Sequence, residues 1–270
     1  MKKISLISLV CSIIILATTT ISAHDFWLIP QKFRISPGDS QTIFANTGMD
    51  FPNSLSAVTP DRVDQFILTG KSGKKDITEF EVQGNSLITK CTFEKTGTYV
   101  ITVSLKPKEI KLTAEEFNEY LLHDGLPDIY ELRKKEGILD KDAVEHYSKY
   151  PKTIIQVGSQ LDKTPTKPLG LPIEIIPQVN PYGLKLGDDL EVTALFQGKP
   201  LSDAEIAWSY PGLGEEFAGS KKTDANGKAA VPLAKVGPYV IRLTHMEWVK
   251  KQTHEWESYW TSLTFEVLPD

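Results

Sequence analysis

Residues 239–267 read YVIRLTHMEWVKKQTHEWESYWTSLTFEV. Within this stretch, apolar and polar residues alternate in Tyr239–Leu243 and again in Tyr259–Val267. Alternation with a period of two is typical of a β-strand that buries one face. We therefore predict a closing β-hairpin whose two strands are joined by a long polar connection, rich in histidine, glutamate and tryptophan.

Residues 24–110 contain further short apolar runs that are separated by turn residues. The runs are 26–30, 33–35, 42–45, 63–68, 86–93 and 99–105. No helical period lies between them, and strands at this spacing favour a β-sandwich. Cys91 lies in one of these runs, and the other cysteine, Cys11, precedes residue 24. We predict that Cys91 is a buried apolar residue without a disulfide partner.

The segment 111–151 has a different, helical character. Thr113 and Glu116 have the spacing of a capping box, in which each side chain binds a backbone N–H at the start of a helix. Apolar residues then recur at three- and four-residue spacing, which predicts one buried helix face. We predict three short helices, beginning after Thr113, at Pro127 and after Asp140, the last covering 143–147.

Residues 152–270 return to short strand-like runs with turns between them, and Asn226-Gly227 is a strong signal for a tight turn. The number of runs, about seven, is sufficient for a second sandwich. The sequence thus predicts a mainly β fold. It consists of two immunoglobulin-like or prealbumin-like β-sandwich domains, 24–110 and 152–270, joined by the helical insert 111–151.

The first 23 residues have the pattern of a signal peptide. Lys2 and Lys3 precede an apolar run over 4–17, and the small residue Ala23 marks a cleavage position. We predict a periplasmic or secreted protein that begins at His24 and is not inserted into the membrane. The formal net charge of −5 gives no indication of nucleic-acid binding.

Histidine and carboxylate residues suggest a transition-metal site. After cleavage, His24 would offer an α-amine and an imidazole nitrogen, which together can chelate Ni²⁺, Co²⁺ or Cu²⁺. His245 and His254 offer further nitrogens, and Glu255 and Glu257 offer oxygens. No thiolate accompanies them, which argues against a structural zinc site of the cysteine type. We predict these five residues as metal ligands, and a distance of about 5 Å or less between the three histidines as the condition for it.

A resemblance to a known family runs through most of the chain. It rests on the stretches 24–27, 51–54, 116–121, 147–150, 156–158, 168–172, 180–182, 198–201, 223–227, 245–246 and 256–265. In these stretches the chain resembles the NikM-like periplasmic family of unknown function, whose members are linked to nickel or cobalt uptake. The resemblance implies a periplasmic protein that serves metal uptake, with a membrane metal transporter as a partner. Members of that family often carry Asp where Glu255 stands, and both residues are oxygen ligands.

Two alternatives stay open at this point. The first is a metal-independent binding or adhesion module that presents its loops to a protein or a glycan. The second is a copper oxidase built on His24 as an N-terminal histidine brace. Nucleotide-binding, zinc-protease and serine-hydrolase motifs are absent from the sequence. We therefore predict a protein that is not an enzyme, and we interpret His123 and His146 as residues that stabilise helix ends.

Overall fold

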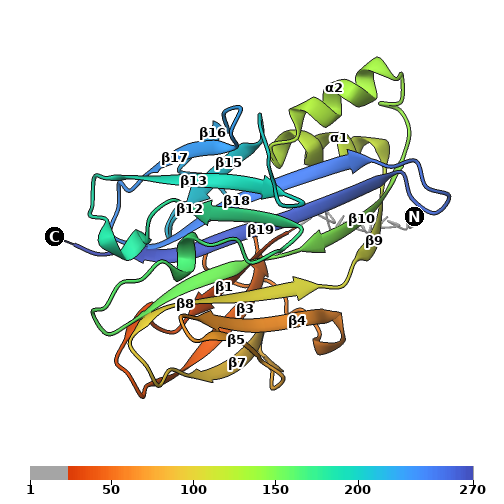
Figure 1. Cartoon of the computed structure of the whole chain (residues 1–270). Coiled ribbons are helices and arrows are strands. Elements are labelled where there is room, and N and C mark those ends of the chain that lie inside the picture. Colours follow the sequence, from red (N-terminus) through yellow and green to blue (C-terminus); the bar gives the residue numbers. More distant parts are fainter. Residues whose placement is uncertain (1–23, 270) are drawn as a thin grey trace, which may run out of the picture.

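The computed structural model describes residues 24–269, whose arrangement is shown in Figure 1. The fold of these residues is mainly β, as predicted, and it contains two α-helices. The strands form three sheets in the described chain. Within the same residues, no helix is long and apolar enough to cross a membrane. The predicted signal peptide, residues 1–23, lies outside the described residues.

The N-terminal sheet has the strand order β1-β3-β7-β6. Its strands are β1 (Asp25–Pro30), β3 (Ser40–Gly48), β7 (Ser86–Thr92) and β6 (Glu81–Gln83). Three of them contain the runs predicted at 26–30, 42–45 and 86–93. Cys91 lies on β7, where it is buried and free, as predicted.

The central sheet has the main order β16-β15-β18-β19-β11-β8-β4-β5. Its strands are β16 (Gly219–Lys222), β15 (Glu205–Ser209), β18 (Gly237–Trp248), β19 (Trp256–Val267), β11 (Lys152–Val157), β8 (Gly97–Leu105), β4 (Val63–Gly70) and β5 (Gly73–Asp76), with β2 (Arg34–Ile35), β9 (Lys108–Leu112) and β10 (Ala143–Lys149) alongside. Strand β11 pairs with β8 on one side and with β19 on the other. One sheet therefore connects strands from both halves of the chain. The division into domains at 110 and 152 stays a prediction.

The third sheet packs against the central sheet on the face away from β1 and β3. Its strands are β12 (Ile173–Pro177), β13 (Asp189–Phe196), β14 (Lys199–Pro200) and β17 (Lys228–Pro232). The alternation of β11 shows the two layers: Ile154 joins the core beneath β12 and β13, whereas Ile155 joins the core beneath β1 and β3. Because successive side chains of a strand point to opposite faces, the central sheet is buried on both sides.

The closing hairpin is present, but its strands are longer than predicted. Strands β18 and β19 pair in antiparallel register from Gly237↔Val267 to Trp248↔Trp256, so the connection is only 249–255. The end nearest the connection is held in strand form because Met246, Trp256 and Trp260 are buried against the helices. His245 and Glu257 consequently lie within strands rather than in a loop, which corrects the prediction of a long polar connection.

The helical segment is confirmed in its first two helices, α1 (Ala114–His123) and α2 (Pro127–Lys135). They lie above the end of the β18–β19 hairpin in Figure 1. Both halves of the capping box are formed: Glu116 N–H donates to the Thr113 hydroxyl, and Thr113 N–H donates to the Glu116 carboxylate. Phe117 is fully buried and packs against Trp256, with ring centroids 5.5 Å apart. Three short 3₁₀ turns occur elsewhere in the described chain, at Pro60–Arg62, Thr164–Thr166 and Pro181–Gly183.

Replacing Thr113 with alanine is expected to destabilise the protein by about 1 kcal/mol, because one N-terminal backbone N–H of α1 then loses its acceptor. Urea unfolding followed by circular dichroism measures this change. Glu119→Ala, at an exposed position of the same helix, is the control and should change stability by less than about 0.5 kcal/mol. Equal effects of the two substitutions would contradict a stabilising role of the cap.

The predicted third helix is wrong. Residues 143–147 belong to β10, which pairs in parallel with β19 and in antiparallel with β9. Strand β10 has a hydrogen-bonding partner on each edge, and a local helix would forgo both. His146 therefore lies on a strand and does not cap a helix, which also corrects its predicted role. His123, by contrast, does end α1.

Candidate functional site

His24 begins the described chain and is held in place by its neighbours. The Lys149 ammonium, at the end of β10, donates a hydrogen bond to the His24 carbonyl. The next residue, Asp25, starts β1 and binds Arg242 through its carboxylate. The His24 imidazole is half-buried, and burial together with the Lys149 charge lowers its pKa. The imidazole is therefore neutral at neutral pH.

Arg242 of β18 joins three elements behind His24. Its guanidinium donates to Asp25 at 3.0 Å and to Asp124 at 2.5 Å, and Asp124 is the capping residue that directly follows α1. Arg242 and Asp124 are buried, and the Asp25 side chain is 13% exposed. Burial raises the pKa of Asp25, and the Arg242 charge opposes that rise. The bridge therefore fixes the start of β1 to the central sheet and to α1.

A buried carboxylate, Glu145, lies on β10 four residues before Lys149. Glu145 is 1% exposed and accepts hydrogen bonds from the hydroxyls of Tyr120 and Ser258 through Oε1. Its Oε2 has no hydrogen-bond partner among the described residues. Burial raises the pKa of Glu145 to about 7, and burial lowers the pKa of nearby Lys149 to about 8. This region thus holds two ionisable groups that titrate near neutral pH.

A cavity of about 840 Å³ opens beside His24 and Lys149. The other walls are strand β9, Tyr147 of β10, the end of β8 and the segment 56–62. The volume lies within the range of sites for small molecules, about 300–1,000 Å³. His24 therefore stands at the edge of a space large enough to receive a ligand.

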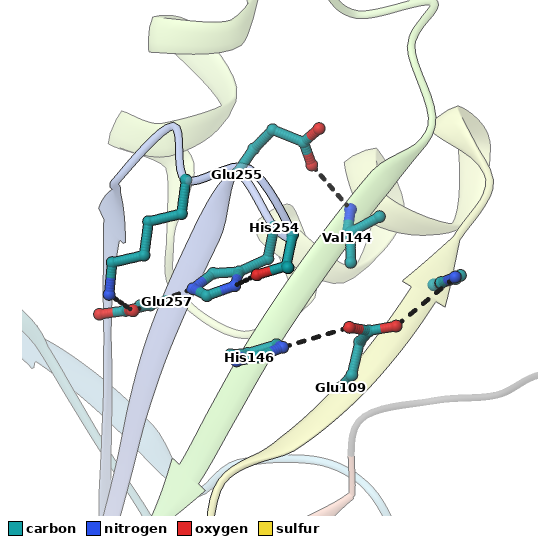
Figure 2. A network of polar contacts seen from close by, with 9 residues as sticks. Glu109, Val144, His146, His254, Glu255 and Glu257 are labelled. Carbon is teal, nitrogen blue, oxygen red and sulfur yellow. Dashed lines mark hydrogen bonds and ion pairs between the residues drawn. The ribbon is translucent and has the colours of Figure 1, made fainter.

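A second polar cluster surrounds His254, at the far end of the hairpin (Figure 2). The His254 ring stacks on His146 with centroids 3.7 Å apart and planes inclined by 16°. Each ring has its own carboxylate: His254 Nε2 lies 2.9 Å from Glu257, and His146 Nε2 lies 3.2 Å from Glu109. Figure 2 shows these carboxylates on opposite sides of the stacked pair, so the two nitrogens do not converge on one point.

The glutamates of this cluster also have partners. Burial tends to raise the pKa of Glu257, but hydrogen bonds from Lys251, His254 and Tyr259 outweigh it and bring the pKa to about 2. Glu255 accepts a hydrogen bond from the backbone N–H of Val144 at 3.2 Å. Glu255 therefore helps to dock the 249–255 loop onto β10. Its carboxylate binds this backbone and is not directed at the stacked rings of His146 and His254.

His245 stands apart from both clusters. It lies on β18 opposite Tyr259, and its ring packs against Phe196 of β13 with centroids 4.3 Å apart. Burial lowers its pKa. Three positions separate His245 from Arg242, so the two side chains point to opposite faces of the sheet. Because Arg242 contacts Asp25, the face of His245 is the one away from the start of β1.

The structure thus brings His254 and Glu257 together, places Glu255 beside them, and leaves His24 and His245 elsewhere. Within residues 24–269, no group of three or more His, Cys, Asp or Glu side chains is arranged to hold a metal ion. Sequence reasoning missed the charged residues behind His24: Lys149, Arg242, Asp124 and Glu145. A usable signal existed for Arg242, since it stands in an otherwise apolar strand where a charge needs a buried partner.

Comparison with known proteins places the chain in a family. Residues 21–247 match a family model described as a domain of unknown function, DUF4198. The chain belongs to this family. The DUF4198 match includes His24, Arg242 and Lys149, and it ends before the 249–255 loop and strand β19. No sequence among curated proteins matches this DUF4198 chain.

Solved structures with some likeness to this DUF4198 protein include three from bacterial proteins. They are the D0-D1 domain of Intimin (10% identity, 89% of this chain and 97% of that chain, TM-score 0.22), the adhesin InvE of Yersinia pseudotuberculosis (13%, 90% and 59%, 0.24) and a Salmonella alpha-2-macroglobulin mutant (9%, 89% and 14%, 0.25). Scores this low carry no argument about topology or function.

Proposed function

We propose that the protein is an exported, non-enzymatic binding protein that holds a transition-metal ion at His24 and supports its uptake. The ion would be Ni²⁺ or Co²⁺, with Cu²⁺ as the alternative, and the partner a membrane metal transporter. The observation that carries the proposal is the anchoring of His24. Lys149 holds its carbonyl and Arg242 holds the next side chain, so the first residue after the predicted cleavage position is fixed at the edge of a cavity.

The chemistry of His24 suits this role. Cleavage after Ala23 would create an α-amine next to the imidazole, and both nitrogens could bind one ion. Metal ligands must be deprotonated, and the lowered pKa of His24 supplies a neutral imidazole at neutral pH. Preorganisation favours binding, because a ligand group that is already fixed loses little conformational freedom when the ion arrives.

Acidic residues around His24 support a cation site. The carboxylates of Glu215 and Asp124 act on the His24 imidazole through space and raise its pKa, against the stronger effect of burial. The Asp124 carboxylate already accepts a hydrogen bond from Arg242. We therefore propose that Glu215, from the 211–218 loop, supplies the oxygen ligand of the metal ion. Of the five ligands predicted from the sequence, this proposal keeps His24. The other four have partners at other places in the fold.

The test is metal titration of protein that the cell has exported and processed, with its N-terminus established by mass spectrometry. Calorimetry with Ni²⁺, Co²⁺ and Cu²⁺ is expected to show one site. Adding a glycine before His24 moves the α-amine away from the imidazole and is expected to weaken binding at least tenfold, about 1.4 kcal/mol. His24→Ala should weaken it further.

His254→Ala is the matched control, because His254 lies in the other polar cluster, and it should leave metal affinity unchanged. Equal affinity with and without the added glycine would remove the α-amine of His24 from the site. Lack of binding by all three ions would instead favour the metal-independent binding module.

A further inference from the structure

We propose that the cavity beside His24 binds a small organic anion, a carboxylate-bearing molecule with an apolar body. This inference goes beyond metal binding and does not depend on it. The cavity wall is basic although the chain as a whole is acidic: it contains Arg62, Lys108, Lys111 and Lys149, against the carboxylates of Asp61 and Glu109. Four cations face two anions there, whereas the whole chain has a formal net charge of −5.

Lys149 distinguishes this cavity from a surface patch of basic residues, because its side chain is held in place by buried contacts. Its side chain is buried, and the residue lines the cavity. The ammonium donates to the His24 carbonyl and lies 5.3 Å from the centre of the Tyr147 ring and 5.0 Å from that of Trp260. A desolvated ammonium is costly, and an anion that enters the cavity would compensate it in a low-dielectric setting where the interaction is strong.

Arg62 supplies a second cation of the cavity wall, and its position is fixed by two contacts. Arg62 lies over the Tyr147 ring at 5.6 Å and donates to the Lys106 carbonyl at 2.9 Å. Arg62 and Lys149 both lie close to the Tyr147 ring, so the two cations and this ring share one part of the cavity wall. Glu109, one of the two carboxylates, already interacts with His146 at 3.2 Å and with Lys111 at 3.5 Å. Lys111 offsets this charge, which leaves Arg62, Lys108 and Lys149 against Asp61 in the cavity wall.

The remaining lining decides between an organic and an inorganic anion. Ala57, Val58, Leu105 and Ile110 contribute apolar surface to the same cavity. Inorganic phosphate would leave this surface exposed to water. A molecule with a hydrocarbon or aromatic body would bury it and gain about 25 cal/mol of binding free energy per Å² of apolar surface. Apolar side chains beside charged ones suit a ligand that has both a hydrocarbon body and a charged group.

The experiment uses exported, metal-free protein and benzene-1,3-dicarboxylate as the probe. Calorimetry is expected to show saturable binding of this dianion at low ionic strength, weakening as salt is added. Its neutral analogue, 1,3-benzenedimethanol, should bind at least tenfold more weakly. Inorganic phosphate should also bind at least tenfold more weakly, and equal binding of phosphate would overturn the organic character of the ligand.

Variants locate the site. Lys108→Gln/Lys111→Gln changes two exposed residues of β9 and is expected to reduce affinity at least tenfold while the fold is retained. Lys199→Gln/Lys221→Gln removes the same charge from exposed strand positions outside the cavity lining and should leave affinity within twofold. Equal losses in the two double variants would overturn the assignment to this cavity. Because no metal is present, failure of the metal proposal would leave this result unaffected.

Discussion

Replacing Arg242 with methionine is expected to destabilise the protein by about 3–5 kcal/mol. The substitution keeps much of the side-chain volume but removes the charge that pairs with Asp25 and Asp124, at 3.0 and 2.5 Å. Both carboxylates would then lose their hydrogen-bonded cation, and removal of one partner from a buried ion pair has a cost of this size. Thermal and urea unfolding measure the change.

The same cluster supplies its own controls. Asp25→Asn/Asp124→Asn/Arg242→Met removes all three charges, and it should recover part of the loss because the two carboxylates no longer remain buried without Arg242. Lys228→Met breaks an ion pair with Glu191 at the surface, where solvent screens the charges, and should have a much smaller effect. A loss below about 1 kcal/mol for Arg242→Met would show that the bridge is not a main anchor of β1 and α1.

The strands and the first helix could be predicted because their signals are local. The apolar run 26–30 and the alternation within 86–93 can each be read from a few neighbouring residues, and the capping box of Thr113 lies within four residues. Strand β10 could not be recognised in this way. Its sequence AVEHYSK has no clean alternation, and its strand form depends on β19, more than a hundred residues away, as a parallel partner. Local propensity yields to such long-range pairing.

The candidate site likewise combines one residue that local sequence identifies with others whose positions depend on long-range strand pairing. His24 was identified from a local pattern, a histidine directly after a cleavage position, and the structure places it beside a cavity. The structure places the hairpin residues that were predicted with it at other points, because side chains on β18 and β19 divide between two faces of the sheet. His245 has the parity of Ile241 and Leu243 and shares their face, whereas Arg242 has the other parity and contacts Asp25. A one-residue difference in register therefore decides which side chain meets the N-terminal strand.

Glu145→Gln is expected to change the pH dependence of stability between pH 5 and 7.5. In the folded protein the pKa of Glu145 is about 7, raised from 4.5 mainly by burial. Between these values the folded state keeps a proton that the unfolded state has released, so this group's contribution to stability falls as pH rises through that window. At 1.36 kcal/mol per unit, the full loss is about 3 kcal/mol.

Glutamine removes this titration. Its carbonyl oxygen can still accept from Tyr120 and Ser258, and its amide nitrogen takes the place of Oε2, which has no hydrogen-bond partner among residues 24–269. Burying this amide nitrogen without a hydrogen-bond partner destabilises the variant by the same amount at both pH values. Relative to wild type, the variant should therefore gain about 2–3 kcal/mol on going from pH 5 to pH 7.5, a range that ends below the pKa of about 8 for Lys149. Urea unfolding at the two pH values measures it, with Glu81→Gln, at an exposed position of β6, as the control. If the difference between Glu145→Gln and wild type is the same at both pH values, Glu145 is already ionised in the folded protein at pH 5.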